Sequence, residues 1–344
     1  MSPTTTAILI SSLATGTIIT ASSYHWLMAW IGLEMNTLAI IPMISKQHHP
    51  RATEAATKYF LTQAAASALI MFASTVNAWQ TGTWDITNLA SHASSTLFTM
   101  AIAMKLGLAP MHFWLPEVMQ GSTTKTAMII TTWQKLAPMA LIYQTSNNLS
   151  TTALITMGMI SATLGGWAGL NQTQARKIMA YSSIAHLGWM ATITTIMPNI
   201  LLLNLLIYLL MTTSMFFTLI LLNSKNIKDM ATSWTTSPTI TTFTMLILLS
   251  LGGLPPLTGF MPKWLILEEL TTQSLTTTAA IMAISSLLSL FFYLRLSYTS
   301  TITLSPNTTT TKHKWRFKQT TSTLLLTLTL PMSTLMLPMT PMLY

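Results

Sequence analysis

The sequence contains no cysteine and few acidic residues. The chain therefore forms no disulfide, binds no covalently attached haem and offers no thiolate to an iron–sulfur cluster. Only 7 residues are Asp or Glu, against 16 Lys and Arg, which gives a net charge of +9. Charged residues make up 7% of the chain, whereas a soluble domain averages about 25%. The chain is therefore not expected to be surrounded mainly by water.

Several ligand-binding motifs are also missing. There is no G-x-x-x-x-G-K-[ST] loop, no dinucleotide fingerprint, no H-E-x-x-H and no cluster of carboxylates. The basic residues lie in short gaps between apolar runs and form no aromatic-spaced patch, so we expect no nucleic-acid partner. We likewise expect no metal and no redox cofactor bound by this chain. The N-terminal MSPTTTAILI has no basic region and no A-x-A site, which argues against a secretory signal or an Arg-rich transit peptide.

Long apolar runs dominate what is present. The chain is 51% hydrophobic, and a membrane span needs about 20 mostly apolar residues. The sequence therefore predicts an all-α polytopic membrane protein. The run that contains Lys135 is predicted to be continuous despite Pro138. Eleven spans are expected, at about 3–22, 24–44, 53–79, 93–116, 122–146, 149–170, 175–196, 198–223, 238–267, 275–298 and 321–343.

The basic residues alternate between the two ends of these spans. Loops on the side of the N-terminus, called side A, hold most of them, whereas side B loops hold no Lys or Arg but carry Asp85, Glu268 and Glu269. The positive-inside rule then places side A in the compartment of synthesis and the C-terminus opposite. The side A residues are Lys46, Arg51, Lys58, Lys125, Arg176, Lys177, Lys225, Lys228, Arg295, Lys312, Lys314, Arg316 and Lys318.

Four charged residues remain inside the predicted spans. They are Glu34, Lys105, Lys135 and Lys263. A charge at the centre of a membrane helix costs about 2.5–3.5 kcal/mol on insertion scales, so these groups need a function or a partner. For Glu34 the alternative to function is a salt bridge that fixes helix register. For Lys263 it is a side chain that reaches the interface near a helix end.

Two of the spans carry the same interruption. Residues 104–116 read MKLGLAPMHFWLP and residues 252–262 read GGLPPLTGFMP, so that Gly107 aligns with Gly253 and Pro110 with Pro256. Proline removes a backbone donor and disfavours helix at the preceding residue. A membrane protein tolerates such a break where protein or trapped water satisfies the freed groups. Paired interruptions in two halves of a chain indicate an ion or substrate path.

The leftover charges suit proton transfer. Burial disfavours the charged forms of lysine and glutamate, and a nearby opposite charge favours them. A Glu34–Lys105 pair could thus switch between states, and buried lysine titrates whereas arginine stays charged. We therefore predict proton transfer by Glu34, Lys105, Lys135 and Lys263. His112 and His186 are candidate relays that hold water, with packing histidines as the equal alternative.

Three segments resemble a known family. KLGLAPMHFWLPEVMQG (105–121), ARKIMAYSSIAHLGW (175–189) and LGGLPPLTGFMPKW (251–264), with the intramembrane Glu34, resemble the antiporter-like membrane subunits of respiratory complex I. The resemblance implies two inverted five-helix repeats, 1–146 and 149–298, each with a discontinuous helix near Gly107–Pro110 or Gly253–Pro256. A basic loop at 299–320 and a C-terminal helix at 321–344 would follow.

The resemblance also implies a function and a place. Protons would be translocated by this chain while FMN, iron–sulfur clusters, NADH and ubiquinone act elsewhere in the complex. The Glu/Lys pair maps onto Glu34 and Lys105, the central lysine onto Lys135 and the distal lysine onto Lys263. The chain would lie in the mitochondrial inner membrane, with the N-terminus and basic loops on the matrix side and the C-terminus in the intermembrane space.

The partners of this chain and the alternatives to proton translocation are as follows. The implied partners are the other membrane and accessory subunits of the complex. The loop from Lys312 to Lys318 either attracts anionic lipid, cardiolipin included, or serves as an ordinary topology signal. Two other functions stay open, a cation/proton antiporter subunit and a structural spacer that pumps nothing.

Overall fold

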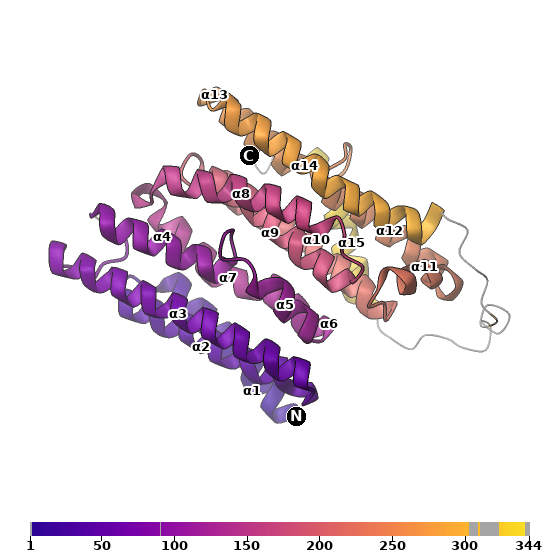
Figure 1. The fold of residues 1–344 in the computed structure, drawn as a ribbon, viewed down its shortest axis with the longest axis horizontal. Coiled ribbons are helices and arrows are strands. Elements are labelled where there is room, and N and C mark those ends of the chain that lie inside the picture. Colours follow the sequence, from indigo (N-terminus) through magenta and orange to yellow (C-terminus); the bar gives the residue numbers. More distant parts are fainter. Residues whose placement is uncertain (1, 90, 303–308, 310–322, 341–344) are drawn as a thin grey trace. The chain divides into compact units, whose positions relative to one another are not determined.

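The computed structural model describes residues 2–89, 91–302, 309 and 323–340 (Figure 1). Its regular structure over these ranges is helical, with two isolated backbone bridges and no strand, so the all-α prediction is confirmed. The α-helices are α1 (Pro3–Ser22), α2 (Trp26–Ile44), α3 (Pro50–Thr81), α4 (His92–Leu106), α5 (Trp114–Gly121), α6 (Thr124–Thr131), α7 (Trp133–Thr145), α8 (Thr151–Gly169), α9 (Ala175–Ile193), α10 (Pro198–Leu221), α11 (Ile227–Thr236), α12 (Pro238–Gly252), α13 (Phe260–Thr272), α14 (Thr276–Ser297) and α15 (Leu324–Leu335). Short helical turns are η1 (Ser45–Gln47), η2 (Ser146–Asn148), the π-turn η3 (Tyr298–Ile302) and η5 (Leu337–Met339).

The chain divides into two compact units. One comprises Met1–Ser161 with Ala191–Pro198, and the other comprises Ala162–Met190 with Asn199–Tyr344. In the first unit α1, α2 and α3 lie side by side, and α3 also packs along α4 and α5 (Figure 1). In the second unit α12 packs along α14 and against α15. Each unit contains one of the two predicted interruptions.

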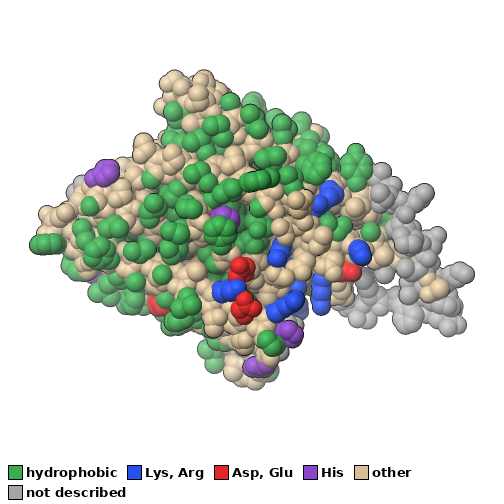
Figure 2. Space-filling model, in the orientation of Figure 1, with side chains coloured by type: hydrophobic (Ala, Val, Ile, Leu, Met, Phe, Trp, Pro, Cys, Tyr) green, Lys and Arg blue, Asp and Glu red, His purple; other side chains and the backbone are tan. Residues whose placement is uncertain are grey.

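Five helices in the described part of the chain are long and apolar enough to cross a membrane. They are α1, α2, α3, α10 and the segment Thr276–Thr301, which continues α14. Hydrophobic side chains cover much of the face seen in Figure 2, and charged ones are few. Large apolar side chains such as Ile8 and Ile18 on α1 are each 65% exposed, which fits a surface that faces lipid. The protein is therefore a multi-pass membrane protein.

Both predicted interruptions occur at the expected glycines. Helix α4 ends at Gly107 and α12 ends at Gly253, and these glycines have left-handed φ values of 77° and 76°. In both, the next N–H reaches back five residues, from Leu108 to the Ala103 carbonyl and from Leu254 to the Leu249 carbonyl. This is the Schellman ending that glycine favours. The chain resumes as helix at α5 and α13.

The span predicted at 122–146 is not continuous. Helix α6 ends at Thr131 and α7 begins at Trp133, with Thr132 between them at φ −108° and ψ −71°. The Thr132 hydroxyl donates to the Met128 carbonyl at 2.6 Å, and such back-bonding bends helices. Pro138, six residues into α7, supplies no N–H to the preceding turn. Lys135 therefore lies three residues after the break, in the first turn of α7, and not within a straight helix.

Two further segments differ from the sequence prediction. Residues 227–236 form α11 where a loop was expected, and a capping box between Asn226 and Asp229 begins that helix. The C-terminal helix α15 runs from Leu324 to Leu335 with Pro331 inside it, and it ends three residues before Pro338. The ends of the predicted segment 321–344, and all four basic residues of the loop at 299–320, lie outside the described residues.

Candidate functional site

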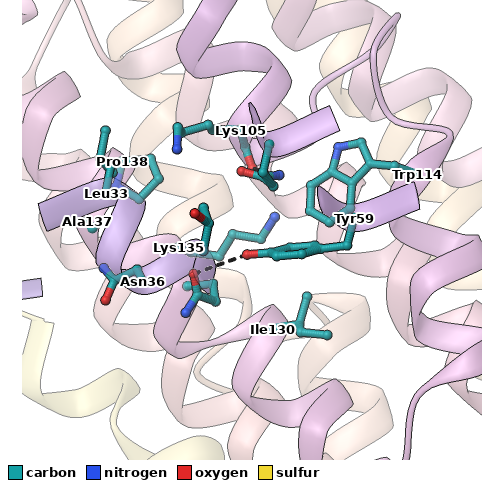
Figure 3. A pocket seen from close by; sticks show the side chains of 12 residues that line it. Leu33, Asn36, Tyr59, Lys105, Trp114, Ile130, Lys135, Ala137 and Pro138 are labelled. Atoms are coloured by element: carbon teal, nitrogen blue, oxygen red, sulfur yellow. Dashed lines mark hydrogen bonds between the residues drawn. The ribbon is translucent and has the colours of Figure 1, made fainter. Parts of the chain in front are cut away.

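A small polar cavity lies inside the first unit. Lys105 at the end of α4 and Lys135 on α7 both line it, and they are only 5% and 1% exposed. Figure 3 shows both lysines at this cavity together with Tyr59 and Trp114. The cavity has about 10 Å³ for the centre of a water molecule, which is about what one water requires. Its lining is Leu33, Asn36, Thr37, Tyr59, Gln63, Lys105, Trp114, Ile130, Gln134, Lys135, Ala137 and Pro138.

Lys135 is bound to backbone. Its Nζ donates to the carbonyl of Leu106, the last residue of α4, and lies 5.5 Å from the centre of the Trp114 ring. The C-terminus of a helix carries a partial negative charge of about half an elementary unit, which favours a cation there. Lys135 is therefore placed by the break in the neighbouring helix. The interruption and the lysine form one site.

Glu34 on α2 lies within electrostatic range of Lys105 and of Tyr59. The structure has no direct ion pair between Glu34 and Lys105, in contrast to Lys58, which pairs with both Glu54 and Glu117. Glu34 Oε2 and Lys105 Nζ are buried and make no hydrogen bond within the described chain. The two charges thus interact through space without being locked together.

A second polar cavity lies inside the second unit. It is lined by Ala185, His186, Trp189, Lys263, Ser289 and Tyr293, from α9, α13 and α14. Lys263 Nζ donates to the Gly252 carbonyl at 2.8 Å, at the end of α12. His186 is 7% exposed, lies within electrostatic range of Lys263 and has its ring 5.7 Å from that of Tyr208. A second break and a second lysine thus meet in the same manner.

The structure brings most of the predicted site residues together in these two groups. Lys105 and Lys135 share one cavity, with Glu34 close by, and Lys263 shares the other with His186. His112 lines neither cavity: it is buried in the connection between α4 and α5, with its ring 4.3 Å from that of Phe113. The assignment of proton transfer to these residues stays a prediction.

The uncharged polar residues of the first cavity were not singled out by the sequence reasoning. Tyr59 Oη donates to Gln134 Oε1 at 3.4 Å, and Asn36 and Gln63 are 2% and 4% exposed. The sequence feature that could have pointed to Asn36 and Gln63 is a carboxamide side chain within an apolar run. Such side chains carry no charge, so they do not stand out against the many Thr and Ser of this chain.

The cavities suit the movement of protons. Each combines a buried lysine with neighbours that both donate and accept hydrogen bonds, such as tyrosine, serine, histidine and carboxamides. Among the described residues no group of three or more His, Asp or Glu could hold a metal ion. The arrangement can bind water and pass a proton between a lysine and that water.

The chain is similar in sequence to known families and proteins. Residues 23–289 match the family model of the membrane part of NADH:quinone oxidoreductase and Mrp antiporters, and residues 290–344 match the model of the NADH dehydrogenase subunit 2 C-terminus. NADH-ubiquinone oxidoreductase chain 2 of Polypterus ornatipinnis is 59% identical over 301 residues, which are 88% of this chain and 87% of that protein. The chain 2 of Xenopus laevis is 57% identical over 302 residues, 88% of each.

Solved structures agree with the sequence matches. A chain of respiratory complex I from Thermus thermophilus superimposes with a TM-score of 0.81 at 28% identity, over 97% of this chain and 79% of that one. A chain of the Mrp complex from Dietzia sp. DQ12-45-1b gives a TM-score of 0.79 at 14% identity, over 97% and 75%. The second likeness concerns the fold alone.

Proposed function

Because the chain belongs to the NADH:quinone oxidoreductase and Mrp antiporter membrane family, among the chain 2 proteins of NADH-ubiquinone oxidoreductase, we propose that its two lysine cavities are parts of one proton path. The chain is a proton-translocating, antiporter-like membrane subunit of respiratory complex I, and hence part of an oxidoreductase. The observation that carries the path is the position of Lys105 and Lys135, which line one water-sized cavity at a helix break.

In this proposal the proton moves by exchange of partners. Glu34 and Lys105 approach and separate, which changes how strongly the charged form of Lys105 is favoured. Lys135 relays the proton, and Lys263 with His186 releases it toward side B. Lys135 and Lys263 each donate to a backbone carbonyl at a helix end, and this carbonyl holds the ammonium group without an acidic side chain. His112, buried between α4 and α5, serves as a further relay.

The wider arrangement belongs to the same proposal. Eleven spans form two inverted repeats, 1–146 and 149–298, in the mitochondrial inner membrane, with side A toward the matrix. Neighbouring membrane and accessory subunits of complex I are the partners. FMN, iron–sulfur clusters, NADH and ubiquinone act in other subunits, and this chain contributes no cysteine to them. Anionic lipid, cardiolipin included, would bind at the basic loop 299–320.

Lys135→Met tests the proposal. Methionine keeps an unbranched apolar side chain of nearly the same length and removes the titrating group, so we expect the proton-to-electron ratio of the assembled complex to fall. The rate of proton translocation should drop by about tenfold, the equivalent of 1.4 kcal/mol on a barrier. Proton uptake by proteoliposomes during NADH oxidation, with ubiquinone reduction followed in parallel, measures both quantities.

The same measurement separates the alternatives. An unchanged proton-to-electron ratio in a normally assembled Lys135→Met complex would identify the chain as a structural spacer. Sodium-dependent flux in the wild-type proteoliposomes would instead support a cation/proton antiporter.

A further inference from the structure

The C-terminal end of α4 meets three side-chain donors from three different helices. Trp114 Nε1, on α5, donates to the Met104 carbonyl at 3.1 Å. Gln63 Nε2, on α3, makes a long contact of 3.5 Å to the Lys105 carbonyl. Lys135 Nζ, on α7, donates to the Leu106 carbonyl. Three consecutive carbonyls at this helix end therefore each accept from one side chain, and the Met104 carbonyl also accepts from the Gly107 N–H at 3.2 Å.

Trp114 joins the two halves of the broken helix. It belongs to α5, the second half, and its hydrogen bond ends on α4, the first half. Its ring packs edge-on against Tyr59, with centroids 5.7 Å apart, and faces Lys135 Nζ. A Cβ at Gly107 would lie 3.4 Å from this ring, which is ordinary van der Waals contact, so it is the positive φ and not the indole that favours glycine here.

The second unit fastens its break differently. Gly252 precedes the left-handed Gly253 as Leu106 precedes Gly107, and its carbonyl also receives a lysine ammonium. That lysine, Lys263, comes from α13, so it spans the break itself. Phe260 stands where the first unit has Trp114, and a phenyl ring has no N–H to offer. In the first unit the lysine comes from a different helix, α7, and the hydrogen bond that joins the two halves of the broken helix is made by the Trp114 indole instead.

We propose that Trp114, together with Gln63, is a positioning residue for Lys135. By occupying the Met104 and Lys105 carbonyls, these two side chains leave the Leu106 carbonyl to the ammonium. Lys135 is thereby held at one fixed site in the cavity that it shares with Lys105. The inference rests on the proposed proton path. It adds that the path depends on the Trp114 indole N–H, which donates to the Met104 carbonyl while Lys135 donates to the Leu106 carbonyl.

Trp114→Phe in the assembled complex tests this inference. The variant keeps an aromatic ring beside Lys135 and Tyr59 and deletes the N–H, so the Met104 carbonyl loses its side-chain donor. We expect proton translocation to fall by about fivefold, the effect of one lost buried hydrogen bond. Electron transfer from NADH to an artificial acceptor should stay at the wild-type rate. The matched control is Trp133→Phe, whose indole Nε1 donates to the Leu13 carbonyl at 3.4 Å in the same unit, and which should pump normally.

The combination with Lys135→Met distinguishes positioning from a general structural role. If Trp114 acts through Lys135, the double variant should pump no worse than Lys135→Met alone, because residues that act through one another are not additive. Additive losses, or a Trp114→Phe complex that pumps like wild type while Lys135→Met does not, would overturn the inference and leave the proposed function standing. A Lys135→Met complex that pumps normally would remove both.

A second variant covers failure of assembly. Gln63→Leu removes the donor to the neighbouring carbonyl with little change of volume, and it should lower pumping by a smaller factor, about twofold for so long a contact. Its loss should also vanish in the Lys135→Met background. A Gln63→Leu loss that persists in that background would contradict the shared role.

Discussion

In an assembled complex that carries Lys105→Ala, proton translocation coupled to NADH oxidation is expected to fall by about tenfold or more. Lys105 is the lysine of the first cavity that makes no hydrogen bond within the described chain, and Glu34 is the charge that acts on it. Alanine removes the titrating group from that pair. Electron transfer to an artificial acceptor, which needs no proton path, should continue at the wild-type rate.

Assembly should survive this change. The Lys105 ammonium is buried and makes no hydrogen bond and no direct ion pair with the described residues, so its removal breaks no bonded contact among them and relieves the cost of one buried charge. Glu34 loses a nearby positive charge, and its carboxyl can take up a proton in response. The amount of intact complex, measured on a native gel, checks this point. Lys125→Ala is the control, because that lysine is exposed on α6, and it should leave pumping unchanged. Full pumping by the Lys105→Ala complex would rule out the exchange with Glu34.

The second large effect is structural. Gly259→Ala should prevent the second unit from folding as described, because a Cβ at Gly259 would lie 1.7 Å from the Ser250 carbonyl oxygen. That atom belongs to the backbone of α12 and cannot rotate away. Overpacking usually costs about 1–3 kcal/mol, and a backbone clash this close exceeds the range. We expect little or no assembled complex on a native gel.

Gly252→Ala gives the matched control. It lies seven residues earlier, in α12, and a Cβ there would meet atoms of Leu290 and Tyr293 at 3.8–3.9 Å, which is ordinary contact. The backbone carbonyl that accepts from Lys263 is retained in alanine. This variant should assemble and pump like wild type. Normal assembly of Gly259→Ala would show that the connection between α12 and α13 can move away from Ser250.

The sequence predicted the helical architecture well because its signals are strong. Runs of about 20 apolar residues predict spans directly, and the segments 3–22 and 198–223 match α1 and α10 within two residues. The glycine before each proline marked the ends of α4 and α12, since a left-handed conformation favours glycine. Lysines within apolar runs marked the two cavities.

What the sequence left undetermined depends on particular contacts. The break at Thr132 arises where threonine hydroxyls compete for carbonyls, and threonine is too common in this chain to signal it. Helix α11 is only 10 residues long and depends on its capping box. The partners of Lys135 and Lys263 are carbonyls, and a residue letter does not identify which carbonyl a helix end leaves available. The search for charged partners therefore pointed to Glu34 alone.

Counter-charges made of main chain have a genetic consequence. A missense change can delete a carboxylate, but no missense change deletes the peptide carbonyls of Leu106 and Gly252 that accept from the two lysines. The vulnerable codons are instead those of Gly107 and Gly253, where any other residue strains a positive φ. A chain with so few acids can thus vary widely in its side chains while both lysines keep their counter-charge.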